Sequence, residues 1–325
     1  MIAWLSILAA GWAGCGLTAW ARREALRLSM YDVANHRSMH QRPTPRGGGL
    51  AIVGLAIAAS ILGSLLGWID GALGMALGVG AASVGGIGWI DDRFDVSARL
   101  RLVVHLAASA LATYLLWPDL PWWAGPAVVL LLTWSINLFN FMDGIDGYAG
   151  SEAACVFGYT ALTAGWLGAF ELAWTAGVLA AASFGFLRWN WPPARIFMGD
   201  VGSGFCGLAV GVCALRAYQV QPAFGWGVAA AYSGFWMDAT LTLATRMITR
   251  QPWYAPHRLH AYQKAARALG RHAPVTWALV ITNLIVLAPA CFACALGILP
   301  IWGLAVWLAP LGLFLGAWSP GVQET

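Results

Sequence analysis

The chain has 325 residues, of which 60% are hydrophobic and only 10% are charged. A soluble domain carries about 25% charged residues, and the apolar residues here occur in runs of roughly 20, the length that crosses a hydrocarbon core as a helix. These values exclude a soluble globular fold and predict an all-α, polytopic integral membrane protein. The net charge of +4 comes without a nucleic-acid-binding motif, so no nucleic-acid partner is expected.

About eleven transmembrane helices are predicted, in one domain that covers residues 1–325 and shows no internal repeat. Their ranges are 2–20, 48–68, 71–90, 102–117, 125–142, 149–167, 171–187, 202–218, 223–246, 274–296 and 298–317. The first range has no basic segment before it, so it is expected to stay as a membrane span rather than to be cleaved as a signal peptide. The six cysteines all fall within these ranges and are expected to be buried thiols.

The basic residues orient this bundle, because all Lys and Arg residues except Arg216 fall in alternate loops. They are Arg22, Arg23, Arg27, Arg37, Arg42 and Arg46 in the first loop, Arg93, Arg99 and Arg101 after the third span, Arg188 and Arg195 after the seventh, and Arg246, Arg250, Arg258, Lys264, Arg267 and Arg271 after the ninth. The positive-inside rule makes these loops cytoplasmic, with the N-terminus outside and the C-terminus inside. The short outer loops carry Asp70, Asp119 and Glu171. The positive charge also favours contact with anionic membrane lipid.

The first inner loop ends in a segment rich in bases, prolines and glycines. It reads H-R-S-M-H-Q-R-P-T-P-R-G-G-G over residues 36–49, with His36 and His40 near its start and Arg46 before the glycines. Positive side chains beside exposed backbone amides suit a phosphate ligand. The alternative is a positively charged flank with a glycine-rich start to the next helix.

Three acids end the third span. Asp91, Asp92 and Asp95 lie at the C-terminal end of a helix, where the macrodipole disfavours each anion by about 0.3–1 kcal/mol. A cation should compensate them, and the candidates are Arg93, Arg99 and a divalent metal ion. The alternative is a charged helix end that is solvated at the membrane surface.

A second polar cluster follows the fifth span. Asn137, Asn140, Asp143 and Asp146 recur every three residues, a spacing that places neighbours on one broad face of a helix. Polar groups so close to a span are costly in lipid, so they should face protein or a water-filled cleft. The interleaved glycines allow close approach of a ligand and are able to end the helix.

Two further segments carry candidate site residues. Asp200 immediately precedes the eighth span, where it is suited to cap the helix, to adjoin a phosphate site or to bind a metal ion. His257 and His260 flank Arg258 in the last basic loop, at a spacing that allows one helical face. Contacts with an anionic diphosphate suit this set, and a solvated loop is the alternative.

The chain resembles the polyprenyl-phosphate N-acetylhexosamine-1-phosphate transferases (glycosyltransferase family 4) through five segments in the family's order. These are P-T-P-R-G-G-G (43–49), D-D (91–92), N-x-F-N-F-M-D-G-I-D-G (137–147), F-M-G-D-V-G-S (197–203) and H-R-x-H-A-Y-Q (257–263). The last segment departs from the denser histidine forms of the family and is closer to members that initiate O-antigen or other lipopolysaccharide glycans.

The resemblance implies transfer of a sugar 1-phosphate from a UDP-sugar to undecaprenyl phosphate. The sugar would be an N-acetylhexosamine or a deoxy derivative, and the products would be undecaprenyl-diphosphate sugar and UMP. The enzyme would lie in the bacterial cytoplasmic (inner) membrane with its active site facing the cytoplasm. The implied cofactor is Mg²⁺, with Mn²⁺ as the alternative, and a homodimer is one option for the oligomeric state.

The same resemblance implies roles for individual residues. Asp200 is the first choice of metal ligand, and Asp91 and Asp92 would assist it or position and deprotonate the acceptor phosphate. The other predicted roles are nucleotide binding by Asn137, Asn140, Asp143 and Asp146, diphosphate contacts by His257, Arg258 and His260, and substrate contacts by Arg46 and Arg101. His257 and His260 are also predicted to be catalytic.

Two other functions compete with this one. An intramembrane aromatic prenyltransferase also uses aspartate-rich motifs, and residues 91–95 read D-D-x-x-D. Such enzymes pair two of these motifs on helices, whereas here the partner is a glycine-punctuated D-G-I-D-G segment. A non-enzymatic secondary transporter would place its charges near the bilayer midplane and often shows inverted repeats.

Overall fold

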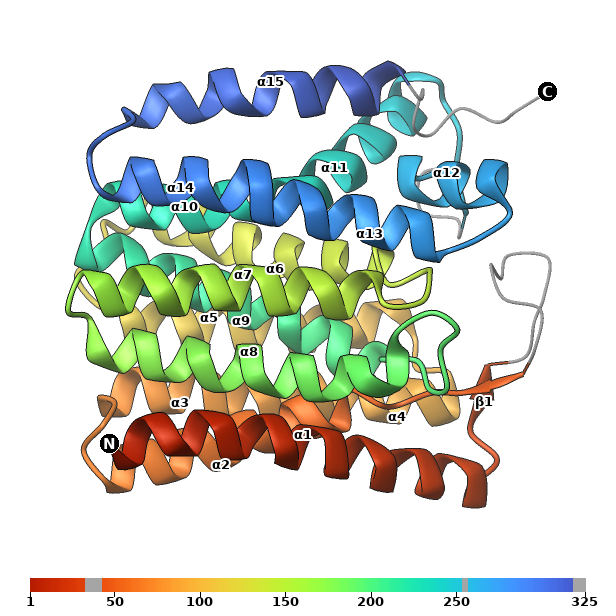
Figure 1. Cartoon of the computed structure of the whole chain (residues 1–325), viewed down its shortest axis with the longest axis horizontal. Coiled ribbons are helices and arrows are strands. Elements are labelled where there is room, and N and C mark those ends of the chain that lie inside the picture. Colours follow the sequence, from red (N-terminus) through yellow and green to blue (C-terminus); the bar gives the residue numbers. More distant parts are fainter. Residues whose placement is uncertain (33–42, 253–256, 318–325) are drawn as a thin grey trace.

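The computed structural model describes residues 1–32, 43–252 and 257–317, which form a bundle of helices lying side by side (Figure 1). The helices are α1 (Ile2–Arg27), α2 (Leu50–Leu65), α3 (Gly71–Gly80), α4 (Gly86–Phe94), α5 (Ala98–Leu116), α6 (Gly125–Phe141), α7 (Tyr148–Trp166), α8 (Phe170–Asn190), α9 (Asp200–Val220), α10 (Pro222–Ala231), α11 (Ser233–Ile248), α12 (Ala261–Leu269), α13 (Ala273–Ile281), α14 (Ala288–Ala295) and α15 (Ile301–Ala317). Short π-helical turns at Ala81–Gly85 and Thr282–Leu287 join α3 to α4 and α13 to α14. The predicted all-α class is confirmed.

Strand structure in the described ranges is limited to one short ladder. The strands β1 (Tyr31–Asp32) and β2 (Thr44–Pro45) pair antiparallel, with Tyr31 opposite Pro45. The ladder closes the first inner loop, and the predicted residues His36, Arg37, His40 and Arg42 lie outside the described residues. Its consequence for the site is that it fixes the start of the glycine-rich segment before α2.

Helices occur at all eleven predicted ranges, but one range is interrupted. The range 223–246 was expected to form one continuous span, whereas it holds α10 and α11 with a break at Tyr232. The Trp236 indole N–H donates to the Ala229 carbonyl at 3.0 Å, so a backbone acceptor near the break keeps a partner inside the bundle. In Figure 1, α11 runs at an angle to α10 and reaches the end of the bundle beside α12.

Six helices are long and apolar enough to cross a membrane, judged by length and composition. They are Ile2–Arg27, Gly71–Phe94, Ala98–Leu116, Phe170–Asn190, Asp200–Val220 and Ala273–Ala295, and the apolar helices Leu50–Leu65 and Gly125–Phe141 are shorter. This supports an integral membrane protein. The count of eleven spans and their orientation stay predictions.

The centre of the bundle is α9, which packs against α6 and α10. Its side chains from Val201 to Cys213 are all buried, and the Ser135 hydroxyl of α6 donates to the Gly207 carbonyl at 2.7 Å. Large apolar side chains such as Leu65, Leu162 and Trp166 instead lie on the surface. Large apolar side chains on the outer surface are what a helix bundle that packs in lipid presents.

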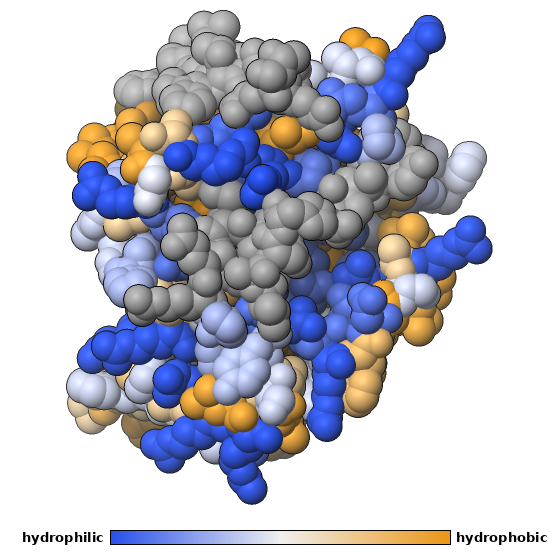
Figure 2. Space-filling model, turned by 90° about the vertical axis from the view of Figure 1, so that its right-hand side faces the viewer, coloured by the Kyte–Doolittle hydropathy of each residue, from blue (hydrophilic) through white to orange (hydrophobic). Residues whose placement is uncertain are grey.

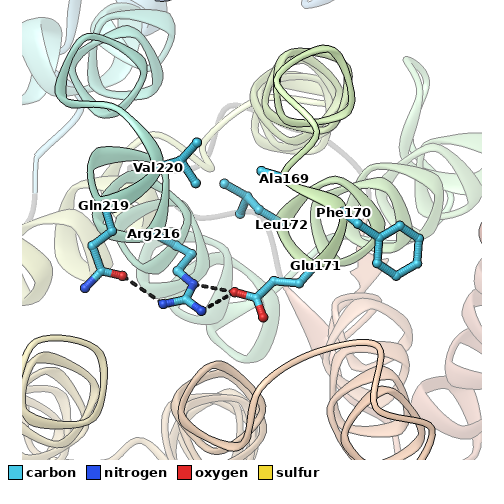
Figure 3. A pocket seen from close by; sticks show the side chains of 7 residues that line it. All are labelled: Ala169, Phe170, Glu171, Leu172, Arg216, Gln219 and Val220. Carbon is cyan, nitrogen blue, oxygen red and sulfur yellow. Dashed lines mark hydrogen bonds and ion pairs between the residues drawn. The ribbon is translucent and has the colours of Figure 1, made fainter.

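The end of the bundle that holds the N-terminus carries a compact ionic cluster. Arg216, the one base that the sequence places on this side, pairs with the Glu171 carboxylate and donates to the Gln219 side chain (Figure 3). It also pairs with the Asp70 carboxylate. The cluster borders a cavity of about 270 Å³ between the start of α8 and the end of α9. It therefore ties α3, α8 and α9 together at the end far from the predicted motifs.

The opposite end gathers the loops that carry the motifs. There α4 ends and α9 begins, and α12 packs against α11 (Figure 1). Figure 2 views this end directly and shows hydrophilic side chains spread over it, with apolar side chains toward its margins. The predicted site residues thus share one polar end of an apolar bundle.

Candidate active site

The glycine-rich segment before α2 pairs with the segment that leads into α9. The N–H groups of Gly48 and Gly49 donate to the carbonyls of Phe197 and Met198, each at 2.9 Å, and the Phe197 N–H donates to the Pro45 carbonyl at 2.8 Å. A Cβ at Gly49 would overlap the backbone of α9, so only glycine allows this approach. Two motifs about 150 residues apart are therefore one structural unit.

Asp92 lies at the end of α4 and caps the start of α9. Its Oδ1 accepts from the Asp200 N–H at 3.1 Å and its Oδ2 accepts from the Val201 N–H at 3.3 Å. The side chain is almost fully buried, and the Arg46 Nε lies 3.8 Å from Oδ1. A carboxylate at a helix N-terminus satisfies free N–H groups and complements the helix dipole.

Gly199 makes room for this cap. Its φ of +76° lies in the region that glycine enters without steric cost, and a Cβ there would overlap the Asp92 carboxylate. The glycine that precedes Asp200 in the F-M-G-D segment is thus required by the crossing of α4 and α9.

Asp91 and Asp200 converge on one cation. The Arg101 Nη1 lies 2.7 Å from Asp200 Oδ2 and also pairs with Asp91 Oδ2. The Asn140 amide N–H donates to the same Asp200 oxygen at 3.1 Å. Asp91 Oδ1 accepts from the Val96 N–H at 2.7 Å. Residues from α4, α5, α6 and α9 therefore meet at one point, which we call the carboxylate junction (Asp91, Arg101, Asn140 and Asp200).

The base that compensates the negative charge of Asp91 is Arg101, and not Arg93 or Arg99, the two arginines that the sequence suggested. Arg101 pairs with Asp91, whereas the Arg93 guanidinium lies over the rings of Trp89 and Phe94 at 5.9 and 5.1 Å. The reason is the break between α4 and α5, where Asp95 adopts a left-handed conformation and redirects the chain. Asp95 itself is exposed, so it does not share a face with Asp91 and Asp92.

The second polar cluster lies only partly on a helix. The predicted continuous face over Asn137, Asn140, Asp143 and Asp146 is wrong, because α6 ends at Phe141 and the two acids lie in the following loop. Asn137 lies one turn before Asn140, and its amide donates to the Thr133 carbonyl at 2.7 Å. Asn140 therefore reaches the carboxylate junction while Asn137 does not.

Asp143 lies in the loop after α6, among the other acids. Burial raises the pKa of Asp143 well above its ordinary value, and the negative charges of Asp200, Asp92 and Asp146 raise it further, against a hydrogen bond with the Gly199 backbone. A nearby cation or a hydrogen-bonding ligand would therefore stabilise the charged form of this carboxyl group.

Asp146 instead holds neighbouring segments together. Its Oδ2 accepts from the Ala194 N–H at 2.9 Å, its Oδ1 lies 3.1 Å from His272 Nδ1, and its carbonyl accepts from the Thr276 hydroxyl at 2.8 Å. Asn190 adds a second link, accepting from the Gly147 N–H and donating to the Ile196 carbonyl. The loop between α6 and α7 is thus fixed to the loop between α8 and α9.

The segment of residues 257–263, which we call the histidine segment, comes to the same end of the bundle. The rings of His257 and His260 lie 5.0 Å apart, and His260 stacks on Phe141 with ring centroids 6.4 Å apart. Burial lowers the pKa of His257 to about 4, and the neighbouring His260 and Arg246 side chains lower it further. Arg258 has an exposed side chain, and its carbonyl accepts from the Arg267 guanidinium at 2.7 Å.

One acid near this segment was missed by sequence reasoning. Asp238 of α11 is buried and contacts the start of α12 and His260. It lies outside every motif, and the signal that could have found it is that it is a lone carboxylate within a predicted span.

The donor set suits a metal ion that is shared with substrate. In the described ranges no group of three or more His, Cys, Asp or Glu side chains is arranged around a metal position. Mg²⁺ is commonly held by one or two carboxylates together with substrate phosphates. Asp91 and Asp200 already point oxygens at one cationic nitrogen, so they fit that arrangement. Both oxygens of Asp92 are taken by backbone N–H groups.

Comparison with known proteins points to one family. The profile of glycosyl transferase family 4 matches residues 72–218, the stretch that holds Asp91, Asp143 and Asp200. A decaprenyl-phosphate N-acetylglucosaminephosphotransferase of Mycobacterium tuberculosis (strain ATCC 25618 / H37Rv) is 32% identical over 284 residues, covering 75% of this chain and 70% of that protein. A Bacillus subtilis (strain 168) protein named "Probable undecaprenyl-phosphate N-acetylglucosaminyl 1-phosphate transferase" is 28% identical over 263 residues, covering 76% and 73%. A phospho-N-acetylmuramoyl-pentapeptide-transferase of Moorella thermoacetica (strain ATCC 39073 / JCM 9320) is 41% identical over 112 residues, covering 33% and 34%.

Proposed function

Because this chain belongs to glycosyl transferase family 4 and is a polyprenyl-phosphate sugar-1-phosphate transferase, we propose that it transfers an N-acetylhexosamine 1-phosphate, or a deoxy derivative, from a UDP-sugar to undecaprenyl phosphate. An oxygen of the acceptor phosphate forms a bond to the β-phosphorus of the UDP-sugar. The bond from that phosphorus to the bridging oxygen breaks, and UMP leaves with the bridging oxygen. The other product is the undecaprenyl-diphosphate sugar.

The observation that carries this proposal is the position of the carboxylate junction. Asp91, Arg101 and Asp200 meet at the polar end of a bundle whose outer surface is apolar. A membrane-bound phosphate reaches such a point from the lipid side, and a water-soluble nucleotide sugar reaches it from solvent. Two anionic substrates that meet there need positive charge to approach one another.

We assign Mg²⁺, with Mn²⁺ as the alternative, to Asp91 and Asp200. When bound, the ion screens the phosphate charges and polarises the attacked phosphoryl group. Arg101, which pairs with both carboxylates, is then free to contact a substrate phosphate, as predicted. Asp92, predicted as a further ligand, holds the backbone of Asp200 in place through its cap of α9.

The remaining residues are assigned by their place around the junction. Asn140 donates to Asp200, and Asp143 lies near enough for the negative charge of Asp200 to raise its pKa; both are assigned to the nucleotide sugar. His257 is neutral at pH 7 and is assigned to the diphosphate with His260, while the exposed Arg258 and the half-buried Arg46 supply positive charge. Asn137 and Asp146 have partners within the protein, so we assign them to supporting this loop.

We place the enzyme in the bacterial inner membrane with this end in the cytoplasm, on the strength of the basic loops. The names of the relatives favour N-acetylglucosamine among the N-acetylhexosamines. The O-antigen or lipopolysaccharide pathway and a homodimer stay predictions from the sequence. In any of these pathways the reaction would be the first membrane step of a cell-surface glycan.

The experiment is a transfer assay in membranes that contain the protein. Undecaprenyl phosphate, Mg²⁺ and a panel of UDP-N-acetylhexosamines are supplied, and UMP and the lipid-linked sugar are measured. We expect equal amounts of both products with one sugar, loss of activity in EDTA, and a loss of about 10³-fold in Asp200→Asn. Asp119→Asn makes the same chemical change at an exposed outer loop and should be neutral. Full activity in EDTA or in Asp200→Asn contradicts the assignment.

The two competing functions are less well supported by the geometry. A prenyltransferase motif needs Asp91 and Asp95 on one helical face, and Asp95 is instead an exposed residue with left-handed backbone that follows α4. A transporter site is expected near the bilayer midplane, whereas the carboxylate junction lies at helix ends.

A further inference from the structure

Asp238 is a buried acid whose partners all belong to the histidine segment or to its own helix. It is 1% exposed, and it lies in the middle of α11. Oδ1 accepts from the Ala261 N–H at 2.9 Å and from the Thr242 hydroxyl at 3.1 Å, and Oδ2 accepts from the Tyr262 N–H at 3.1 Å. Because both oxygens are occupied, the carboxylate orientation is fixed.

These contacts cap α12 from a different helix. The first N–H groups of a helix lack acceptors within the helix, and here Asp238 accepts hydrogen bonds from two of them, those of Ala261 and Tyr262. His260 precedes α12 and forms a capping box with Gln263, so Asp238 adds to a local cap: the His260 side chain accepts from the Gln263 N–H, and the His260 N–H donates to the Gln263 side chain at 3.4 Å. Nine residues of α12 are short for a stable isolated helix, which normally needs about 12–15, so its position depends on such contacts.

The same carboxylate faces the His260 ring. His260 Nδ1 lies 3.6 Å from Asp238 Oδ1 and has no hydrogen-bond partner among the described residues, although it is buried. On its other sides the ring meets Phe141, Tyr262 and His257. Asp238 Oδ1 thus lies beside this nitrogen, just beyond hydrogen-bond distance.

We propose that Asp238 is a positioning residue, which holds the start of α12 and the His260 ring so that the histidine segment faces the carboxylate junction. This inference rests on the proposed function for its kinetic consequence, but the contact with α12 does not. Asp238 plays for α12 the part that Asp92 plays for α9: each is a buried acid that caps a helix carrying a site residue at its start.

The first test measures the contact without any substrate. Amide hydrogen exchange of residues 261–264 is followed in detergent-solubilised wild type, Asp238→Ala, Asp238→Asn and the control Asp119→Asn. We expect about tenfold faster exchange in Asp238→Ala, a smaller change in Asp238→Asn, which keeps one acceptor oxygen, and none in the control. Exchange in α9 should stay unchanged. Wild-type exchange of α12 in Asp238→Ala overturns the proposal.

The second test asks whether Asp238 acts through His260. In the transfer assay Asp238→Ala should lower kcat by about 10²-fold with KM for the UDP-sugar within about threefold, since misplacement by about 1 Å has effects of that size. In a His260→Ala background, Asp238→Ala should lower kcat by less than about threefold, because the imidazole ring that Asp238 positions is already absent. A merely structural role predicts multiplicative losses instead.

The outcomes separate the two proposals. If the wild type transfers none of the sugars tested, the proposed function fails, while the exchange experiment still decides the contact of Asp238 with α12. If the wild type is active, faster exchange with unchanged kcat, or fully multiplicative losses, overturns the positioning role. A variant that fails to fold is recognised by its exchange in α9, and Asp238→Asn then carries the comparison.

Discussion

Asp143 and Asp146 are three residues apart, but the structure gives them different surroundings. Asp146 has protein partners on both oxygens, at Ala194 and His272. Asp143 is half-buried; burial and the negative charges of Asp200, Asp92 and Asp146 raise its pKa, and a hydrogen bond with the Gly199 backbone opposes them. We therefore expect the Asp146 side chain to stabilise the fold and the Asp143 side chain to bind the ligand.

Substitution should separate these roles. Asp146→Ala removes hydrogen bonds within the loop, so we expect a loss of about 1–3 kcal/mol in the free energy of unfolding, seen as a lower melting temperature. Asp143→Ala should leave the melting temperature near that of the wild type, and should raise KM for the UDP-sugar about ten- to a hundredfold. Thermal melting in detergent and UMP release measure the two effects. A stable Asp146→Ala with weak nucleotide use, beside an unstable Asp143→Ala, would reverse the assignment.

His257 gives a prediction about pH. Burial lowers its pKa from 6.5 to about 4, so the folded protein binds fewer protons at this ring than the unfolded chain does between these values. The stability that it contributes is therefore full above pH 6.5 and is lost as the pH falls from 6.5 toward 4. His257→Gln has no proton to bind, so its melting temperature should fall less than that of the wild type between pH 7 and pH 5. An equal fall in the melting temperatures of wild type and His257→Gln would contradict the lowered pKa of His257.

At the scale of elements, the ionic cluster at the N-terminal end of the bundle links three helices. Among the described residues, Arg216 of α9 is the positive partner of both Asp70, before α3, and Glu171, in the first turn of α8. Removing it leaves two carboxylates close together, since the Asp70 N–H also donates to Glu171 Oε2 at 3.0 Å. The cluster is partly exposed, so its contribution should be modest.

Arg216→Met should therefore lower the melting temperature by about 2–5 °C, corresponding to roughly 1 kcal/mol in a chain of this size. Transfer activity per folded protein should stay within twofold, because the cluster lies at the end of the bundle far from the carboxylate junction. The triple variant Asp70→Asn, Glu171→Gln, Arg216→Met removes the repulsion as well and should recover part of the loss. A triple variant less stable than Arg216→Met would show that the carboxylates matter for another reason.

At the scale of the whole molecule, the sequence predicts the bundle and the end at which the motifs meet, but not the pairings between them. Hydrophobic runs and alternating basic loops are local patterns, and they located helices at all eleven ranges. The choice of Arg101 over Arg93 depends on the direction of α5 after the left-handed Asp95, and the cap of α9 by Asp92 joins positions 108 residues apart. Asp238 carries no neighbouring motif, so only the crossing of α11 and α12 identifies its role.

The arrangement of the whole bundle yields the prediction on which the site's location depends. Ser97, between α4 and α5, and Asp119, between α5 and α6, are both exposed and lie on either side of one helix. In a variant that lacks the six native cysteines, Asp119→Cys should react with a membrane-impermeant maleimide in intact cells. Ser97→Cys should react only after the cells are opened, because the basic loops place that end in the cytoplasm. Labelling of Ser97→Cys from outside would put the carboxylate junction on the wrong side for a UDP-sugar, and so would contradict the proposed donor together with the orientation.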